Sequence, residues 1–257
     1  MIAAQRRTLI AEIVRDEGAA SIAALARRLD VSPVTVRRDL DFLDSLGLVQ
    51  RSHGGATAGS QNPEAPYADK IGQAMPEKAA IGRLAAGLVH DGDVIAVGPG
   101  TTTEWLARAL TGRTGLTIVT NSLLVADVFV DSSSNQVILT GGELRGSIRA
   151  VVGDAAVRTY RGIHADLAFL SGNGLDAGFG LSTPSMIVAE TDRTIAGCAR
   201  ELVVLADHTK LGTRTAVQTV PTERIAQLVT DAGSAAAQLE PIAARGVTLH
   251  IAATPVT

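Results

Sequence analysis

The chain has 257 residues, of which 46% are hydrophobic, 19% are charged and 3% are aromatic, and its formal net charge is −3. This composition excludes a wholly disordered chain and a collagen-like repeat, and a single cysteine, Cys198, excludes a disulfide scaffold and a multi-thiolate zinc site. No apolar run approaches the ~20 residues that cross a bilayer, and the charged start of the chain lacks the pattern of a signal peptide. The sequence therefore predicts a cytoplasmic protein without a membrane partner.

The charge is unevenly distributed along the chain. Residues 1–57 carry 8 Lys and Arg against 7 Asp and Glu, whereas the remainder carries 15 against 19. The sign of the charge thus changes between the two parts, which leaves nucleic-acid binding by the first part open. The five histidines lie far apart without metal-ligand spacing, so a metal site is not expected. No cofactor is predicted.

Apolar residues at helical spacing predict three helices in the first 57 residues. These helices cover residues 5–17, 22–29 and 33 to about 46. Ser21 and Ser32 stand where their hydroxyls can cap the second and third helices, and Pro33 is favoured in a first helical turn. Residues 48–51 are expected to form a short strand that leads into a tight turn. Residues 1–57 are therefore predicted to form a small domain.

The second and third helices, joined by a short turn, have the outline of a helix-turn-helix. The inner face of the third helix is expected to hold Val36, Leu40 and Leu43. Its start and outer face supply candidate DNA-binding residues: Ser32, Val34, Thr35, Arg37 and Arg38. Arg51 and His53 on the strand and turn would belong to a wing. Two alternatives remain at this point: a three-helix bundle with merely solvated arginines, and a winged helix that binds only protein.

Residues 58–75 are rich in small, polar and proline residues, which is typical of a linker. Beyond them, apolar strands alternate with helical patterns. Strands are expected at 93–97, 116–120, 136–140, 166–170, 201–206 and 247–252, and helices at 77–89, 102–111, 122–131, 151–161, 184–199 and 234–244. This alternation predicts an α/β domain over residues 76–257 with a mostly parallel sheet.

Loops of small polar residues follow four of the predicted strands, at 98–103, 120–122, 140–142 and 207–210. Because ligands of open α/β sheets bind outside the carboxyl ends of the strands, the four loops predict one shared pocket. In the first loop, backbone N–H groups and the helix start at Thr101 and Thr102 would form an anion site. Lys210 would add positive charge for a phosphate or carboxylate, and Asp207 would accept from sugar hydroxyls. Each loop can equally be a structural turn, with Asn121 and Asp207 as helix caps.

The run LARRLDVSPVTVRRDLDFLDSLGLVQRSHGGA closely resembles the winged helix-turn-helix signature of the DeoR family of bacterial transcriptional regulators. The resemblance covers nearly the whole chain, through the steps GDVIAVGPGTT, VTNS, LTGGELR, DLAFLSGNGLD and DHTKLG. It implies that the first domain binds double-stranded operator DNA and that the second is a sensor similar in fold to ribose-phosphate isomerase and the CoA transferases. It also implies repression of a carbohydrate-metabolism operon, controlled by a phosphorylated sugar or related metabolite.

By position, the resemblance assigns effector binding to residues of the loops and of one strand: Gly100, Thr101, Thr102, Asn121, Gly142, Asp166 and Lys210. Two departures from the family pattern bear on which effector fits. Pro99 stands where the family usually has a small residue such as serine, which removes a hydroxyl from the anion loop. Asp192 and Ile195 replace a lysine and a methionine that relatives commonly carry in this helix.

An active sugar-phosphate isomerase with an appended DNA-binding domain is the main alternative, since Asp166, Asp207 and Lys210 resemble parts of an isomerase site. The stretch SGNGLDAGFG lacks the lysine of the isomerase loop, and HADLAFL lacks a paired acid, which favours binding without catalysis. No catalytic residue is therefore predicted. A homo-oligomer, either dimer or tetramer, is expected because a helix-turn-helix reads paired half-sites. The effector, the operator and the sign of regulation stay open.

Overall fold

The computed structural model describes residues 2–45, 48–52, 54–58 and 67–253. The chain divides into two compact units, residues 1–66 and residues 67–257, and each is described by itself. None of the described helices combines the length and the apolar character that crossing a membrane requires.

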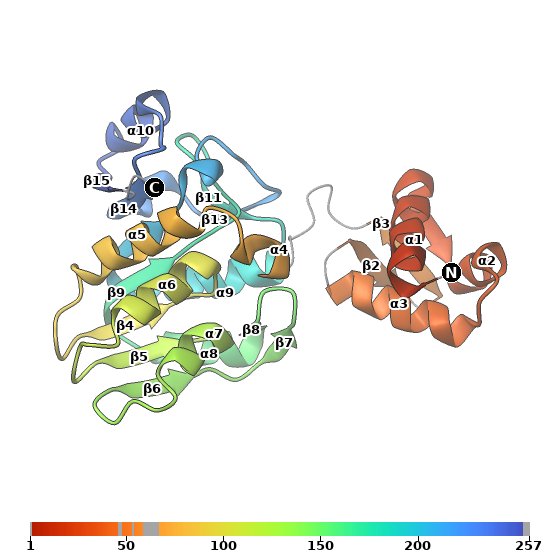
Figure 1. The fold of residues 1–257 in the computed structure, drawn as a ribbon, viewed down its shortest axis with the longest axis horizontal. Coiled ribbons are helices and arrows are strands. Elements are labelled where there is room, and N and C mark those ends of the chain that lie inside the picture. The colour runs from red at the N-terminus through yellow and green to blue at the C-terminus, as the bar shows by residue number, and fades with distance from the viewer. Residues whose placement is uncertain (1, 46–47, 53, 59–66, 254–257) are drawn as a thin grey trace. The chain divides into compact units, whose positions relative to one another are not determined.

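The first unit consists of three helices and a small antiparallel sheet (Figure 1). Its elements are α1 (Ala3–Glu17), β1 (Ala19–Ser21), α2 (Ile22–Leu29), α3 (Pro33–Ser45), β2 (Val49–Ser52) and β3 (Gly55–Ala58). The three helices and β2 confirm the prediction, whereas β1 and β3 were not expected. The strand order is β1-β3-β2, so β2 and β3 form the hairpin of a wing. The buried core joins all three helices through Ile10, Val14, Leu25, Val36, Leu40 and Leu43.

Local chemistry explains the turns of this unit. The Ser21 hydroxyl accepts from the Ala24 N–H at 3.1 Å and so caps α2, and the Ser32 hydroxyl accepts from the Thr35 N–H at 3.1 Å at the start of α3. Gly55 lies opposite Ser21 where β3 pairs with β1, and a Cβ there would approach the Ala20 carbonyl oxygen to 2.1 Å. A glycine is therefore required at this point of the hairpin.

The second unit is built on a seven-stranded sheet in which every neighbouring pair of strands is parallel. The order is β15-β14-β12-β9-β4-β5-β6. In chain order these strands are β4 (Val94–Val97), β5 (Thr117–Thr120), β6 (Gln136–Leu139), β9 (Ala165–Leu170), β12 (Ala199–Leu205), β14 (Gln227–Asp231) and β15 (Thr248–Ala252). All six predicted strands are present, which confirms the α/β class, and β14 is an addition.

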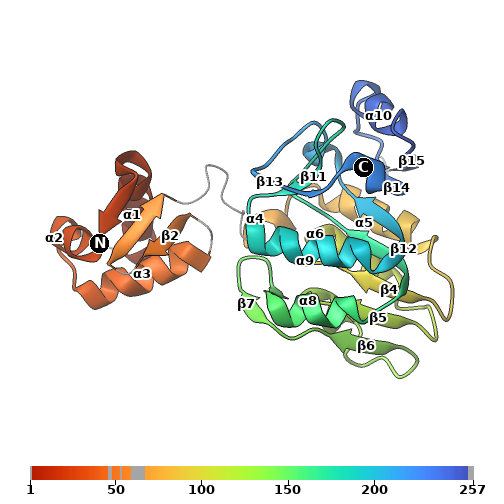
Figure 2. The same cartoon turned by 180° about the vertical axis from the view of Figure 1, so that it is seen from behind.

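Helices cover both faces of this sheet. They are α5 (Met75–Ala86), α6 (Thr101–Ala109), α7 (Leu123–Val128), α8 (Asp154–Arg161), α9 (Met186–Gly197) and α10 (Ala236–Ala243). The first three pack on one face and share a core with Ile95 and Val97, while the last three pack on the other and share a core with Ala96 (Figures 1 and 2). This alternation along β4 follows from the two-residue period of a strand. All the parallel strands therefore end at one edge, where loops can converge.

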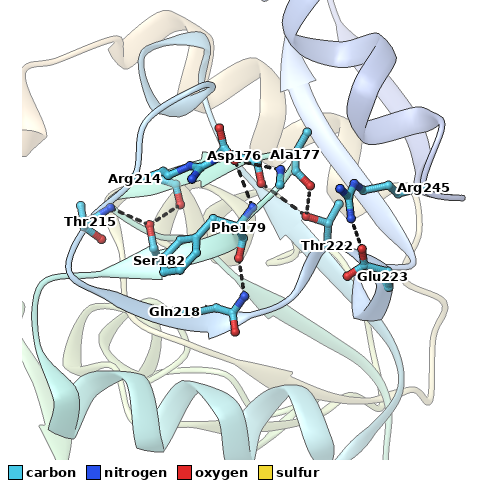
Figure 3. A network of polar contacts seen from close by, with 12 residues as sticks. Asp176, Ala177, Phe179, Ser182, Arg214, Thr215, Gln218, Thr222, Glu223 and Arg245 are labelled. Carbon is cyan, nitrogen blue, oxygen red and sulfur yellow. Dashed lines mark hydrogen bonds and ion pairs between the residues drawn. The ribbon is translucent and has the colours of Figure 1, made fainter.

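Two small antiparallel sheets complete the second unit. One pairs β7 (Glu143–Arg145) with β8 (Ala150–Val152), and the other joins β10 (Gly174–Asp176), β11 (Gly180–Thr183) and β13 (Val217–Val220). In the second, the Asp176 carboxylate accepts from Arg214 at 2.8 Å and the Ser182 hydroxyl accepts from the Thr215 N–H at 3.0 Å (Figure 3). Burial alone would raise the pKa of Asp176, but the Arg214 guanidinium and the backbone N–H donors outweigh it and lower that pKa.

The segment expected to be a linker contains a helix. Residues 67–71 form a short helix, α4 (Tyr67–Ile71), which belongs to the second unit. The Tyr67 hydroxyl donates to Glu104 Oε2 at 2.9 Å, and its backbone N–H donates to the Ser147 carbonyl at 2.8 Å. The second unit therefore begins at Tyr67 rather than at residue 76.

Candidate functional site

The outer face of α3 carries the side chains that the sequence singled out. Val34 is 53% exposed, Arg37 and Arg38 are exposed, and Thr35 is half-buried, whereas Val36 on the inner face is fully buried. The hydroxyls of Ser32 and Thr35 lie 2.9 Å apart, so at the helix start they are bonded to each other. The face thus exposes two arginines and a valine, which are side chains that could supply donors for phosphate or base edges and an apolar contact.

The wing residue Arg51 is held against α3. Its guanidinium pairs with Asp41, and its backbone N–H donates to the Asp44 carboxylate at 3.0 Å. Arg51 therefore has to exchange Asp41 for a phosphate if it contacts DNA. His53, the other predicted wing residue, lies outside the described residues.

A buried ion pair that the sequence reasoning missed orients α3 against α1. The Asp39 side chain is nearly inaccessible, and it accepts from Arg6 Nε at 2.5 Å and from Arg7 Nε at 2.8 Å. Burial alone would raise the pKa of Asp39, but the hydrogen bonds and charges of the two arginines outweigh it and lower that pKa. Arg7 also stacks over the Phe42 ring at 3.9 Å. These contacts join α3 to α1.

In the second unit, the loop after β4 leads into the amino end of α6. Gly100 has φ of 152°, and a Cβ there would lie 2.2 Å from the Ser171 hydroxyl, so the loops after β4 and β9 touch. The first intrahelical bond runs from the Glu104 N–H to the Gly100 carbonyl. Among the described residues nothing accepts from the backbone N–H groups of residues 101–103, so this helix start can receive an anion.

Neighbouring strand ends place further predicted residues at the same edge. Asn121 follows β5 and is fully buried, but its Nδ2 donates to the Val151 carbonyl at 2.9 Å and its Oδ1 accepts from the Tyr160 hydroxyl at 3.3 Å. Gly142 approaches Val152, whose carbonyl oxygen would lie 2.4 Å from a Cβ at that position. Both residues therefore have structural roles in joining β5 and β7 to β8.

Asp207 and Lys210 follow β12 at the same edge. Asp207 is buried, and its carboxylate caps the short helix η1 (His208–Lys210) by accepting from the Thr209 N–H at 3.0 Å and from the Thr209 hydroxyl. Lys210 is half-buried at the end of η1. Helix capping is the structural alternative that the sequence left open for Asp207. The charged side chain of Lys210 lies at the same edge of the sheet.

Asp166 does not share this edge, and its predicted place beside the other residues is wrong. It lies near the start of β9, where its Oδ2 accepts from the N–H of Val94, the first residue of β4, at 3.0 Å. Its other oxygen lies 3.9 Å from Arg200. Because the strands are parallel, Asp166 stands at their amino ends, opposite the loops described above.

The same edge holds polar groups that the sequence reasoning missed. Lys78 on α5 is only 3% exposed, and its Nζ donates to the Lys70 carbonyl at 2.8 Å. Burial lowers the pKa of Lys78, an effect that the charge of Lys210 increases and that of Asp207 opposes. Thr140 follows β6 and Thr183 ends β11, and the buried hydroxyls of both have no hydrogen-bond partner within the described residues. Such groups point to a polar ligand or water.

A winged helix-turn-helix followed by a parallel α/β unit with a polar carboxyl edge defines a DNA-binding regulator with a sensing domain. The family models agree with this class. Residues 6–62 match the DeoR-like helix-turn-helix domain, and residues 73–232 match the DeoR C terminal sensor domain. The chain belongs to the DeoR family of transcriptional regulators.

Curated relatives align over most of their length. The chain is 38% identical to the uncharacterized HTH-type transcriptional regulator YgbI of Escherichia coli, over 91% of both chains. It is 36% identical to the HTH-type transcriptional regulator GlpR of Haloferax volcanii, over 97% of this chain and 98% of the relative. It is 32% identical to the glycerol-3-phosphate regulon repressor of Escherichia coli, over 89% and 90%.

Among solved structures, a ribose 5-phosphate isomerase A from Methanocaldococcus jannaschii aligns with 54% of this chain and 55% of its own. The TM-score is 0.41 and the sequence identity is 18%.

Proposed function

We propose that this protein is a repressor of a carbohydrate-metabolism operon, that α3 and the wing bind its operator, and that a phosphorylated sugar or related metabolite controls this binding. Support for repression comes from relatives named as repressors of the glycerol-3-phosphate regulon and of the lactose phosphotransferase system. The effector binds at the carboxyl edge of the sheet. The observation that carries this assignment is the helix start at residues 101–103, whose N–H groups have no acceptor within the described chain.

Titration of the protein with its own upstream DNA tests this function directly. We expect binding at nanomolar concentrations that weakens steeply as salt rises, and release of the DNA by at least one member of a panel of sugar phosphates. A DNA affinity that does not change with salt concentration, or DNA complexes that no phosphorylated metabolite dissociates, would refute the proposal.

Binding without turnover is preferred to the isomerase alternative because of where Asp166 lies. An isomerase site composed of Asp166, Asp207 and Lys210 requires the three at one place, but Asp166 accepts from Val94 at the opposite edge of the sheet. Asp207, in turn, is committed to capping η1. The edge therefore offers an anion site and hydroxyls, and of the carboxylates that the structure describes there, Asp207 caps η1 and Glu104 is bonded to Tyr67 and Arg108.

Each exposed arginine of α3 is expected to contact either a base edge or a phosphate of the operator. Arg37→Ala or Arg38→Ala should weaken operator binding by about 1–3 kcal/mol and relax specificity at one base pair if the side chain contacts a base edge. If it contacts only phosphate, affinity should fall equally on all sequences and the salt slope should drop by about one. Fluorescence anisotropy on operator and unrelated DNA distinguishes the two cases. Wild-type affinity in both variants would mean that α3 is not the recognition helix.

The division between the units is expected to be a functional one. A fragment of residues 67–257 should unfold cooperatively and bind the effector without binding DNA, because α4 and the anion-site elements belong to the second unit. A fragment starting at residue 76 lacks α4 and is expected to be less stable. Thermal unfolding of the two fragments, followed by circular dichroism, measures the difference, and equal stability would place the boundary at residue 76 instead.

We also infer that the protein acts in the cytoplasm as a homo-oligomer, a dimer or tetramer. A helix-turn-helix reads paired half-sites through a symmetric assembly, and operator DNA lies in that compartment. Sedimentation equilibrium of the full chain, with and without operator, measures the assembly, and a monomer in both conditions would contradict it.

A further inference from the structure

A valine stands at the centre of the outer face of α3. Val34 is the second residue of this helix, and its side chain is 53% exposed. At 3.6 residues per turn, Val34 points about 180° away from Leu43, which is buried in the core of the first unit. An amphipathic helix is expected to carry a polar side chain at such a position. Packing within the unit therefore does not explain the valine.

Helix stability does not explain the valine either. A β-branched side chain loses rotational freedom in a helix, and valine is a poorer helix former than alanine, lysine or glutamate. The start of α3 is already capped, because the Ser32 hydroxyl accepts from the Thr35 N–H at 3.1 Å and pairs with the Thr35 hydroxyl at 2.9 Å. The apolar side chain of Val34 is thus left to contact a partner molecule.

Two arginines flank Val34 on the same face of α3. Arg38 lies about one turn further along the helix and about 40° around it, and Arg37 lies about 60° around it in the other direction. Both arginines are exposed, whereas Asp41, further along this face, is paired with Arg51 of the wing. Phosphates that bind the two cations would bring the apolar group between them against the base edges of a groove.

The base edges of the major groove offer one kind of apolar group. It is the C5 methyl group of thymine, whereas adenine, guanine and cytosine present hydrogen-bond donors and acceptors there. A valine side chain cannot satisfy a donor or an acceptor, and covering one without a hydrogen bond costs free energy. A valine between two DNA-binding arginines therefore favours thymine over the other three bases.

On the basis of the proposed function, we propose that Val34 contributes to operator specificity by packing against the C5 methyl group of a thymine in each half-site. The flanking arginines supply affinity and fix the register of α3, and the valine adds a preference at one base pair. Because this contact joins two apolar groups, its loss should leave the salt dependence of DNA binding unchanged.

Replacing the thymines of the upstream DNA one at a time by deoxyuridine tests the proposal, because uracil differs from thymine only in lacking this methyl group. With the full chain and fluorescence anisotropy, we expect one position in each half-site where the replacement weakens binding about fourfold, the value of one buried methyl group. If no position responds while the protein still prefers this DNA to an unrelated duplex, the thymine contact is overturned and the proposed function stands. Equal affinity for the two duplexes would refute both.

The variant Val34→Ala shows whether this side chain makes the contact. It should weaken binding to the unmodified DNA about four- to fifteenfold, depending on whether one or both of its methyl groups contact the base, and keep the wild-type salt slope. At the responsive position, deoxyuridine should then cost the variant less than about twofold, because both changes delete the same contact. Wild-type affinity in Val34→Ala, or additive losses, would overturn the proposal.

Thermal unfolding and a second variant separate lost contact from lost fold. Val34→Ala should unfold at or above the wild-type temperature, since alanine is the better helix former and the replaced side chain is exposed. Clear destabilisation would assign Val34 to the fold and overturn the proposal. Val130→Ala is the matched control, because Val130 is a 73% exposed valine in the second unit, and it should bind the unmodified and the deoxyuridine DNA as the wild type does.

Discussion

Replacing Asp39 by alanine is expected to destabilise the first unit by about 3 kcal/mol and to abolish operator binding. The carboxylate is buried between α3 and α1, where it accepts from Arg6 and Arg7. Its removal leaves two guanidinium groups facing an apolar site without their anion. Removing one partner of a buried pair typically costs 3–5 kcal/mol, and the lower end applies because the Arg7 side chain is 31% exposed.

The chain offers a direct measurement of this loss. Its single tryptophan, Trp105, lies on α6 in the second unit, so tryptophan fluorescence reports on that unit alone, whereas circular dichroism reports on both. In urea, Asp39→Ala should move the dichroism transition of the first unit to a lower urea concentration. The fluorescence transition of the second unit should stay where it is in the wild type. Asp41→Ala is the matched control on the same helix, because Asp41 pairs with Arg51 but is 62% exposed, and it should cost below about 1 kcal/mol. Equal losses in the two variants would contradict the role given to the buried pair.

Acid provides a second measure of the same interaction. The pKa of Asp39 is lower in the folded unit than its ordinary value of 3.8, so folding is stabilised by the ionised carboxylate above that value. The stabilisation is lost as the pH falls below 3.8 and through the lower pKa of the folded state. The first unit of Asp39→Asn should therefore lose less stability than the wild type over this acid range.

Helices and parallel strands could be predicted from the sequence because each carries a long periodic or apolar signal. The start at Pro33 and the run DVIAV are examples, and both appear as expected in α3 and β4. Most of the elements that were missed belong to short antiparallel pairs, such as β1 with β3, whose three or four residues give too little pattern to detect. The parallel strand β14 and the short helix α4 were missed as well. The expected helix at 151–161 begins only at Asp154, because Gly153 takes φ of 95° after the strand β8.

The candidate site was predictable where it depends on strand ends and not where it depends on packing. Loops after parallel strands converge by topology, and Thr101 and Lys210 follow the parallel strands β4 and β12. Asp166 was assigned by resemblance, although its place at the start of a strand already puts it at the opposite edge. Lys78 carried no signal in the sequence, since its burial depends on how α5 packs in the folded unit.

Lys210→Ala is expected to weaken binding of the effector about ten- to a hundredfold, because a hydrogen bond to a charged group contributes about 1.5–3 kcal/mol. Lys210 is the last residue of η1 at the carboxyl edge of the sheet, and its charge helps to lower the pKa of Lys78. Operator binding without effector should stay close to wild type, because an effector shifts the protein only through its different affinity for the two states. Calorimetry and DNA titrations on the full chain measure the two quantities. Arg224→Ala, which removes an exposed cation from the other short helix, η2 (Thr222–Arg224), is the control and should change neither.

A double-mutant cycle shows whether Lys210 contacts the phosphate itself. Four affinities are needed: wild type and Lys210→Ala, each with the metabolite that releases the protein from DNA and with the same metabolite lacking its phosphate. If the lysine and the phosphate contact each other, each change deletes the same interaction, so removing the phosphate costs the wild type much more than it costs the variant. Additive losses would place Lys210 outside the anion site. Isomerase turnover that disappears with Lys210 would instead show that the edge of the sheet performs catalysis, because a site that only senses its ligand binds it without converting it.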